Sequence, residues 1–292
     1  MLQSFFSRLM GVVVLLSFLG LQSSHSQHKK PGQIYEEGRH WADSVYSTLT
    51  PDERISQLFW LTVDAVGDIS KNHRDVQLVE KWKPGGIIFF ESKVDDMVHM
   101  SNYMQELSDV PLFVVADGEL GMGMRFKETI AYPKAMTLGA IQNNQLIRQL
   151  GKEVARQFKE AGIHVNLAPV ADVNNNPDNP VIGARSLGEE PDNVTDKAVA
   201  FLSGLQANGV MGVAKHFPGH GDTDKDSHKT LPFISHSREH LNQVEFPPFS
   251  AMIDSGAWGV MTAHLEVSSI EPRQGLPATF SSEVIQNILR PS

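Results

Sequence analysis

The segment from Lys215 to His228 carries the densest group of chemically active side chains in the sequence. It holds three histidines, at positions 216, 220 and 228, and three aspartates, at positions 222, 224 and 226. Pro218, Gly219 and Gly221 indicate a shaped turn in place of a regular helix or strand. Imidazole and carboxylate groups can transfer protons or bind metal ions, so the segment could serve acid–base catalysis or a metal site. The alternative without a chemical role is a solvated loop whose charges neutralise one another.

Calcium binding is the first metal interpretation of this segment. Asp222, Asp224 and Asp226 occupy the first, third and fifth positions of an EF-hand loop. The sixth position should be glycine and is Ser227, and the twelfth should be glutamate and is Phe233. The pattern therefore argues against calcium.

Zinc is the second metal interpretation. A hydrolytic zinc site could use His216, His220 and His228 together with an aspartate. The spacing of these histidines matches no established ligand pattern, so a zinc hydrolase stays a weaker alternative. We predict neither a bound metal nor another cofactor. Metal analysis of the purified protein distinguishes a zinc hydrolase from a protein without zinc.

Acid–base chemistry by Asp226 and His228 is the third interpretation, and the sequence favours it. One residue separates the two side chains. A carboxylate next to an imidazole raises the pKa of the imidazole and selects its tautomer. Such a histidine can protonate a leaving oxygen and later activate a water molecule. We therefore predict Asp226 and His228 as catalytic residues.

Two further polar clusters could bind a substrate. Residues 174–186 contain enough asparagine and proline to suit any exposed loop, but Arg185 there offers a planar fork that holds hydroxyls or carboxylates. Residues 117–125 begin with Asp117, and a carboxylate at a strand end suits hydrogen bonds from polyol hydroxyls. The glycines that follow lack the spacing and the lysine of a phosphate-binding loop.

Six short apolar runs predict the strands that position these clusters. Strands buried on both faces of a parallel sheet are apolar in this way, and glycine or proline bounds each run. The runs lie at residues 57–63, 85–90, 111–116, 164–168, 210–214 and 259–263. Helical patterns lie between them at 144–161 and 191–205. In the first of these, the apolar residues Leu146, Leu150, Val154 and Phe158 recur every fourth position.

Strand–helix alternation of this kind predicts an α/β fold with a parallel sheet. A (β/α)8 barrel and an open doubly wound sheet both fit the alternation. Polar residues directly follow several runs, among them Asp117, Asp172, Lys215, His216 and His264. Functional groups at successive strand ends favour the barrel, because an open sheet collects them at one switch point.

Composition and charge narrow the class of protein. The chain has 292 residues, of which 41% are hydrophobic and 20% are charged. Its formal net charge is −9 and it has no basic stripe, so we expect no nucleic-acid partner. It has no cysteine, which excludes disulfides and a lipidated N-terminal cysteine. Its stability must therefore come from burial of a core.

The N-terminal residues have the composition of a secretory signal peptide. Arg8 precedes an apolar run at residues 9–21, and small residues follow at 24–26. The run is shorter than the roughly 20 residues that span a bilayer, so we expect cleavage after residue 26 and no stable membrane span. We therefore expect an exported protein, periplasmic or extracellular. Residues 27–50 would form a leader before a main domain at 51–292.

Several motifs, in this order along the chain, resemble glycoside hydrolase family 3 in its β-N-acetylhexosaminidase branch. The most specific is KHFPGHGD at residues 215–222, followed by Asp226-Ser227-His228. The others are DGE at 117–119, NLAPVADVN at 166–174, NPVIGARSLGE at 179–189 and MTAH at 261–264. The likeness runs from about Pro51 to the end of the sequence.

The resemblance implies a (β/α)8 TIM-like barrel and retaining hydrolysis of β-linked N-acetylglucosamine from oligosaccharides or peptidoglycan fragments. It assigns the acid/base role to Asp226 and His228. The family's sugar-binding positions correspond here to Asp117, Arg185, Lys215 and His216. Some relatives transfer the sugar to phosphate in place of water, so phosphorolysis is an alternative to hydrolysis.

The sequence departs from the family pattern at two places. An arginine commonly follows the glycine pair of the loop after the third strand, whereas Met122 stands near that place and Arg125 lies three residues further on. The family's nucleophile is an aspartate on the strand after the sixth, and the sequence contains no such segment, because it ends at residues 288–292 in the helix expected before that strand.

From the second departure we expect about six of the eight βα units, in a barrel domain cut before the nucleophile strand. Such a barrel would leave two sheet edges open. A retaining glycosidase also needs a second carboxylate roughly 5–5.5 Å from the acid/base. A catalytically inactive fragment or a sugar-binding module of the same family is therefore an alternative to the hydrolase.

Overall fold

The computed structural model describes residues 31–66, 69–70, 73–226 and 230–290. The signal peptide predicted at residues 1–26 lies outside these residues. The strands are β1 (Trp60–Val63), β2 (Gly86–Phe89), β3 (Ser92–Lys93), β4 (Phe113–Ala116), β5 (Phe126–Lys127), β6 (Val165–Asn166), β7 (Met211–Phe217), β8 (Phe233–Ile234), β9 (Gly259–Thr262) and β10 (Glu266–Val267).

Helices connect most of these strands. The α-helices are α2 (Pro31–Thr48), α3 (Pro51–Ser56), α4 (Arg74–Trp82), α5 (Val94–Leu107), α6 (Ala135–Gly139), α7 (Asn144–Glu160), α8 (Pro191–Ala207), α9 (Arg238–Gln243) and α10 (Phe246–Asp254). The 3-10 turns are η1 (Met122–Met124), η2 (Gly183–Arg185) and η3 (Ala278–Phe280), and η4 (Glu283–Leu289) is a π-helix.

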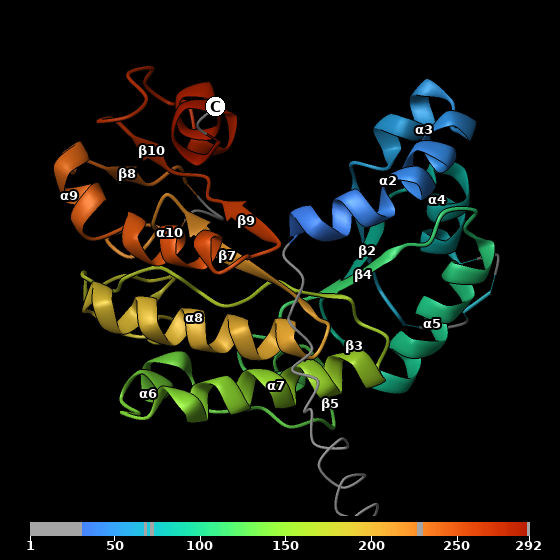
Figure 1. Ribbon diagram of the computed structural model, residues 1–292, viewed down its shortest axis with the longest axis horizontal. Helices are drawn as coiled ribbons and strands as arrows, with labels where there is room; N and C mark the ends of the chain where they lie inside the picture. The colour runs from blue at the N-terminus through green and yellow to red at the C-terminus, as the bar shows by residue number, and fades with distance from the viewer. Residues whose placement is uncertain (1–30, 67–68, 71–72, 227–229, 291–292) are drawn as a thin grey trace, which may run out of the picture.

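Six strands form one parallel sheet in the order β1-β2-β4-β6-β7-β9. The order follows the chain without reversal, and every neighbouring pair is parallel. An open doubly wound sheet would change direction at a switch point, so this is the order of successive βα units of a barrel. The predicted α/β fold with about six units is confirmed. Within the described residues, β1 and β9 form the two edges of the sheet (Figure 1).

Two predicted strand boundaries are wrong by about three residues. β1 begins at Trp60, because Gln57 is still the C-terminal cap of α3 and the chain turns between them. β7 continues through Lys215 and His216 to Phe217, although the sequence predicts a loop after residue 214. The two polar residues stand within the strand because bonding to β9 continues there, with a shift in register between Lys215 and Phe217.

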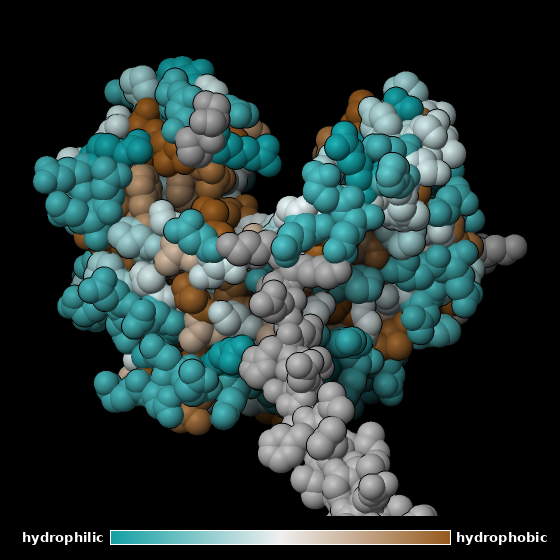
Figure 2. All heavy atoms as spheres, viewed as in Figure 1, coloured by the Kyte–Doolittle hydropathy of each residue, from teal (hydrophilic) through white to brown (hydrophobic). Residues whose placement is uncertain are grey.

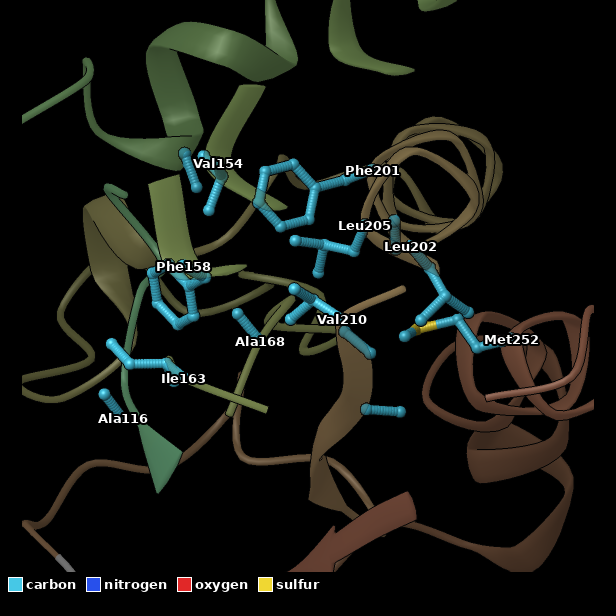
Figure 3. Packing of buried hydrophobic residues seen from close by; sticks show 14 of the residues in the cluster. Ala116, Val154, Phe158, Ile163, Ala168, Phe201, Leu202, Leu205, Val210 and Met252 are labelled. Atoms are coloured by element: carbon cyan, nitrogen blue, oxygen red, sulfur yellow. The ribbon is translucent and has the colours of Figure 1, made fainter. Parts of the chain in front are cut away.

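The main core lies between the sheet and helices α7, α8 and α10, which lie in successive rows (Figure 1). Figure 3 shows Phe158 of α7, Phe201 and Leu205 of α8, and Met252 of α10 in this core. Each is buried, and burial of a side chain of this size contributes roughly 1.5–3 kcal/mol. Packing of these three helices against the sheet therefore fixes the positions of the strands and of their ends.

The strands are buried on both faces, as the apolar runs predict. In β4, Val114 and Ala116 belong to the main core, whereas Val115 belongs to a second cluster with Val165 and Val213 on the inner side of the curled sheet. Figure 2 shows an opening between the part of the molecule that holds α2 and α3 and the part that holds β9, with hydrophobic residues beside β9.

The helix predicted at 144–161 is confirmed as α7, and Gly162, with φ of +74°, follows its end. Its buried face differs from the predicted one, because Leu146 is 50% exposed while Ile147 is buried. A strict four-residue repeat advances about 40° per step on a helix of 3.6 residues per turn. The row is therefore buried at Val154 and Phe158 but has left the buried face at Leu146.

Residues 31–48, within the predicted leader, form helix α2. A cavity of about 780 Å³ lies between this helix and the sheet, lined on opposite sides by Trp41 and Tyr46 and by Trp60 and Phe113. In the described part of the chain, no helix combines the length and the apolarity needed to cross a bilayer.

Candidate active site

The carboxyl ends of β4, β6 and β7 bring charged side chains from three parts of the chain together. Asp117 directly follows β4, Asp172 lies in the loop after β6, and Lys215 and His216 are near the end of β7. These strands are neighbours in the parallel sheet, so their ends lie at one rim. The rim is where a barrel places its chemistry.

Lys215 is the centre of this cluster. Its side chain is only 2% exposed, and its Nζ lies 2.8 Å from Oδ1 of Asp117 and 2.6 Å from Oε1 of Glu119. Both carboxylates are also shielded from water. A buried ammonium is tolerated only when paired, and here two carboxylates pair with it.

Two arginines complete the charge balance. Arg185 of η2 holds Glu119 with both arms of its fork, through Nε at 3.0 Å and Nη2 at 2.8 Å. Arg125, after η1, lies 2.5 Å from Asp117 through its Nη2. With Lys215, three cations face these two carboxylates, and the carboxylate of Asp172 beside His216 balances the third positive charge.

Both carboxylates are ionised at neutral pH. Burial alone would raise the pKa of Glu119, but Lys215 and Arg185 hold that pKa at about 2. Burial would likewise raise the pKa of Asp117, and Lys215 with Arg125 keeps it below its usual range. A hydroxyl-rich ligand would therefore meet a charged, hydrogen-bonding surface here.

Asp172 orients the histidine next to Lys215. It is fully buried and accepts hydrogen bonds from the backbone N–H groups of His216 and His220, the latter at 2.8 Å. Its pKa stays below the usual range despite burial, chiefly because of His216. An ionised carboxylate can only accept, so Nδ1 of His216, 2.7 Å away, donates to it. Nε2 then faces Nη2 of Arg185 at 3.4 Å.

Gly118 allows the turn that carries two of these carboxylates. A Cβ at this position would overlap the ring of Phe158 in α7, so only glycine lets the chain approach the helix here. The amide of Asn166 in β6 bonds both backbone groups of Gly118, accepting at 2.9 Å and donating at 3.3 Å. Asp117 and Glu119 thus point to the same cluster from either side of one fixed glycine.

Asn179 ties the loop that carries Arg185 to the loop after β7. Its Nδ2 donates to the carbonyl oxygens of His220 at 2.8 Å and Gly221 at 2.9 Å, and its Oδ1 accepts from Ile182 N–H at 2.8 Å. The asparagine-rich segment is therefore an ordered connection at the rim and not only an exposed loop.

The β7 loop, residues 218–226, carries the predicted acid/base residue Asp226. The loop is held by Asn179 and by an ion pair between Asp222 and Nε2 of His236. Asp226 is partly buried, and its carbonyl oxygen accepts from Thr230 N–H at 3.0 Å. His228 lies outside the described residues.

Residues 50–292 match the model of the glycosyl hydrolase family 3 N-terminal domain. The chain belongs to this family. The match covers every residue of the cluster at the rim, and it places the curled six-stranded sheet within a family domain of the TIM-barrel type.

Curated family 3 relatives include several β-hexosaminidases. The chain is 32% identical over 237 residues to β-hexosaminidase A of Pseudoalteromonas piscicida, covering 73% of this chain and 40% of the relative. It is 35% identical to a β-hexosaminidase of Nitrosomonas eutropha, covering 70% and 61%. It is 32% identical to β-hexosaminidase LpqI of Mycobacterium tuberculosis, covering 84% and 62%. The chain thus spans less than two thirds of each of these relatives.

Solved family 3 structures resemble the fold. A β-N-acetylglucosaminidase from a Paenibacillus strain matches with a TM-score of 0.77 and 35% identity, over 83% of this chain and 47% of that one. NagZ from Neisseria gonorrhoeae, in complex with N-trifluoroacetyl-D-glucosamine, matches with a TM-score of 0.70 and 28% identity, over 79% of this chain and 69% of that one.

The structure brings four of the six predicted site residues together. Lys215 contacts Asp117, and Arg185 lies beside His216, so the predicted sugar-binding residues form one cluster. Their sugar-binding role stays a prediction, as does the acid/base role of Asp226 and His228.

Three residues of the cluster were not predicted from the sequence as site residues. Glu119 and Asp172 follow strand ends inside recognised motifs, and that position is the signal that could have identified them. The sequence does not decide whether Arg125 replaces the family's usual arginine, whose place is near Met122. In the structure, Arg125 reaches Asp117 from the same loop.

No group of three His, Asp or Glu side chains is arranged to hold a metal ion in the described parts of the chain. Of the three histidines considered for zinc, His216 turns its Nδ1 to Asp172 and His220 turns its Nδ1 to Thr223, each at 2.7 Å. Burial lowers the pKa of His220, so its ring is neutral at neutral pH.

Proposed function

We propose that this site acts in a retaining β-N-acetylhexosaminidase, which removes β-linked N-acetylglucosamine from oligosaccharides or peptidoglycan fragments. The observation that supports the proposal most is the cluster formed by Asp117, Arg185, Lys215 and His216 at the barrel rim. These are the four positions that the family resemblance assigns to sugar binding. The chain is also about one third identical to several β-hexosaminidases.

Exposure separates the cluster into two layers. The side chains of Asp117, His216, Arg125 and Arg185 are 11%, 16%, 23% and 31% exposed, so a sugar can reach them. Lys215 and Glu119 are almost fully buried beneath them. Asp117 has lone pairs beyond those used by Lys215 and Arg125, and these suit two neighbouring sugar hydroxyls. Lys215, which is itself held by Glu119, then fixes the carboxylate of Asp117 against rotation.

The reaction would have two steps, each with one proton transfer by His228. In the first step, His228 gives a proton to the glycosidic oxygen as the bond from C1 breaks, and a second carboxylate, which the family resemblance places on the strand after β9, bonds to C1. In the second step, the same histidine takes a proton from water, whose oxygen displaces the carboxylate from C1. The products are free N-acetylglucosamine and the alcohol. Asp226 would stabilise the protonated imidazole before the first step and after the second.

Turnover of a chromogenic N-acetyl-β-glucosaminide tests this function. We expect release of the chromophore, with the matching β-glucoside as a poor substrate. Asp226→Ala and His228→Ala should each lower kcat by roughly 10²–10⁴-fold, the usual size of acid–base catalysis. Asp224→Ala, at an exposed position of the same loop, is the control and should retain activity. Turnover that survives both Asp226→Ala and His228→Ala would contradict the assignment.

Product analysis separates the alternatives. With inorganic phosphate present, an N-acetylglucosamine 1-phosphate product would show phosphorolysis in place of hydrolysis. Heat of binding to N-acetylglucosamine without turnover would favour a sugar-binding module. Chitin oligosaccharides and peptidoglycan fragments, compared by kcat/KM, would identify the preferred substrate class.

We also propose that the protein is exported and that its leader is removed after residue 26. The composition of residues 1–26 supports this. Fractionation of cells followed by N-terminal sequencing checks it. Mature protein beginning at Gln27 outside the cytoplasm is expected, and an intact Met1 in the cytoplasm would exclude export.

A further inference from the structure

Glu245 is a buried carboxyl directly behind the β7 loop. It precedes α10 and is 1% exposed. Its Oε1 accepts a hydrogen bond from Nδ2 of Asn175 at 3.0 Å. Its Oε2 has no hydrogen-bond partner among the described residues. An unpaired buried oxygen costs less free energy on a neutral carboxyl group than on a charged one.

Oε2 of Glu245 faces the backbone of the β7 loop. Gly219 has a φ of +128°, and a Cβ added there would overlap Oε2 of Glu245. Two residues further on, a Cβ at Gly221 would overlap the carbonyl group of Val173 in the loop after β6. The β7 loop is therefore packed backbone-first between Glu245 and the segment that also carries Asn175.

The charged groups that act on Glu245 are carboxylates. Asp172 stands in the loop after β6 and Asp222 in the β7 loop, and each disfavours a second negative charge nearby. The neighbouring histidines are already paired: His216 bonds Asp172, His236 bonds Asp222, and His220 of the β7 loop bonds Thr223. Burial and these two carboxylates raise the pKa of Glu245 to about 8, despite the bond from Asn175.

We propose that Glu245 is a positioning residue, whose neutral carboxyl group holds the β7 loop and with it Asp226. Oε1 accepts the amide of Asn175, so it is the carbonyl oxygen and the proton resides on Oε2, against Gly219. Ionisation places an unpaired charge between Asp172 and Asp222. The loop must then move or admit water to solvate that charge.

The proposal has a structural and a catalytic consequence. Movement of the β7 loop depends only on the surroundings of Glu245. Loss of activity from that movement rests in addition on the proposed function, in which Asp226 is part of the acid/base pair. A measurement of loop movement therefore tests the role of Glu245 alone, and a measurement of activity tests that role together with the proposed function.

Trypsin cleavage after Lys225, an exposed residue of the β7 loop, reports on the loop alone. With a pKa of about 8, the ionised fraction of Glu245 rises from about one tenth at pH 7 to about nine tenths at pH 9. Cleavage of the wild-type chain, normalised to a peptide substrate at each pH, should rise about fivefold or more. Glu245→Gln keeps the shape without the titration and should show no such rise.

Glu271→Gln is the matched control. Glu271 is also buried, but it is bonded to Arg273 and Ser281, which hold its pKa at about 2. This variant should keep the wild-type pH dependence of cleavage. The same pH dependence in wild type and Glu245→Gln would overturn the proposal.

A further measurement uses only the wild-type chain and therefore tests the proposal even if the Glu245→Gln chain does not fold. Carboxyl ¹³C NMR of the wild-type chain should show one glutamate that titrates near pH 8, together with amide shifts of Gly219 and Gly221. A spectrum in which no glutamate titrates above about pH 6.5 would exclude the proposal. In an active preparation, kcat should fall about fivefold more between pH 7 and 9 in wild type than in Glu245→Gln, because any fall that comes from the acid/base pair is common to both. A chain without turnover would argue against the proposed function and leave the loop result intact.

Discussion

Two glutamates show how burial decides the effect of an ion pair on stability. Glu119 and Glu153 each accept two hydrogen bonds from an arginine, and each has a pKa of about 2. The side chain of Glu153, on the surface of α7, is 40% exposed, whereas that of Glu119 is 3% exposed. Water screens the first pair, but loss of the second would leave Lys215 and Arg185 short of a counter-charge.

Glu119→Gln should therefore destabilise the fold by about 3 kcal/mol, the low end for breaking a buried pair. The free energy of unfolding in urea at pH 7 measures this. Glu153→Gln is the control, with an expected change below about 1 kcal/mol because its pair is exposed. Equal effects of the two substitutions would show that the buried ion pair contributes no more to the free energy of unfolding than the surface pair does.

At the scale of elements, α7 and α8 approach one another through a pair of glycines. A Cβ at Gly204 would overlap the carbonyl oxygen of Arg148, and a Cβ at Gly151 would overlap that of Phe201. The backbones are thus in direct contact, which lets Phe158 and Phe201 reach the same core from two helices (Figure 3). α7 in turn packs behind Gly118, which carries the turn between the two site carboxylates.

Gly204→Ala should destabilise the chain by about 2 kcal/mol, because separating two packed backbones outweighs the better helix propensity of alanine. Thermal unfolding measures the change. Gly38→Ala in α2 is the matched control, since nothing lies within 4 Å of a Cβ there and alanine should be neutral or stabilising. A stabilising Gly204→Ala would refute close helix contact.

At the scale of the molecule, two kinds of buried carboxyl act against one another as pH changes. Glu119 has a folded pKa of about 2 against the ordinary value of 4.5, so its stabilising effect is complete above pH 4.5 and is lost as pH falls toward 2. Glu245 has a folded pKa of about 8 against 4.5. Between pH 4.5 and about 8, protonated Glu245 gives the folded chain one proton more than the unfolded chain. The free energy of unfolding therefore falls as pH rises through this range.

Stability should therefore be greatest near pH 5 and decline on both sides. The fall from pH 5 to 8 attributable to Glu245 is at most about 1.4 kcal/mol per pH unit, the value for one proton. Melting temperatures of wild type and Glu245→Gln across pH 3–9 check this. The variant should lose the decline above pH 5 and keep the decline below pH 4.5. A wild-type melting temperature that is flat from pH 5 to 8 would contradict the assignment.

The sequence by itself determined the local elements and the kind of site. Apolar runs between glycines and prolines located all six strands of the main sheet, because burial on both faces leaves that pattern in each strand separately. Polar residues at strand ends identified Asp117, Lys215 and His216, because parallel strands place their carboxyl ends at one rim. Both features are encoded within a few neighbouring residues.

Only the tertiary structure decided how these residues are paired. The bond of Arg185 to Glu119 joins residues 66 positions apart, and that of Glu245 to Asn175 joins residues 70 apart. Such contacts depend on the register of neighbouring strands and the paths of the loops between them, which no local pattern records. The charge on a buried carboxyl depends on the same contacts, so Glu119 is held ionised by cations, and Glu245 is kept neutral by burial together with neighbouring carboxylates.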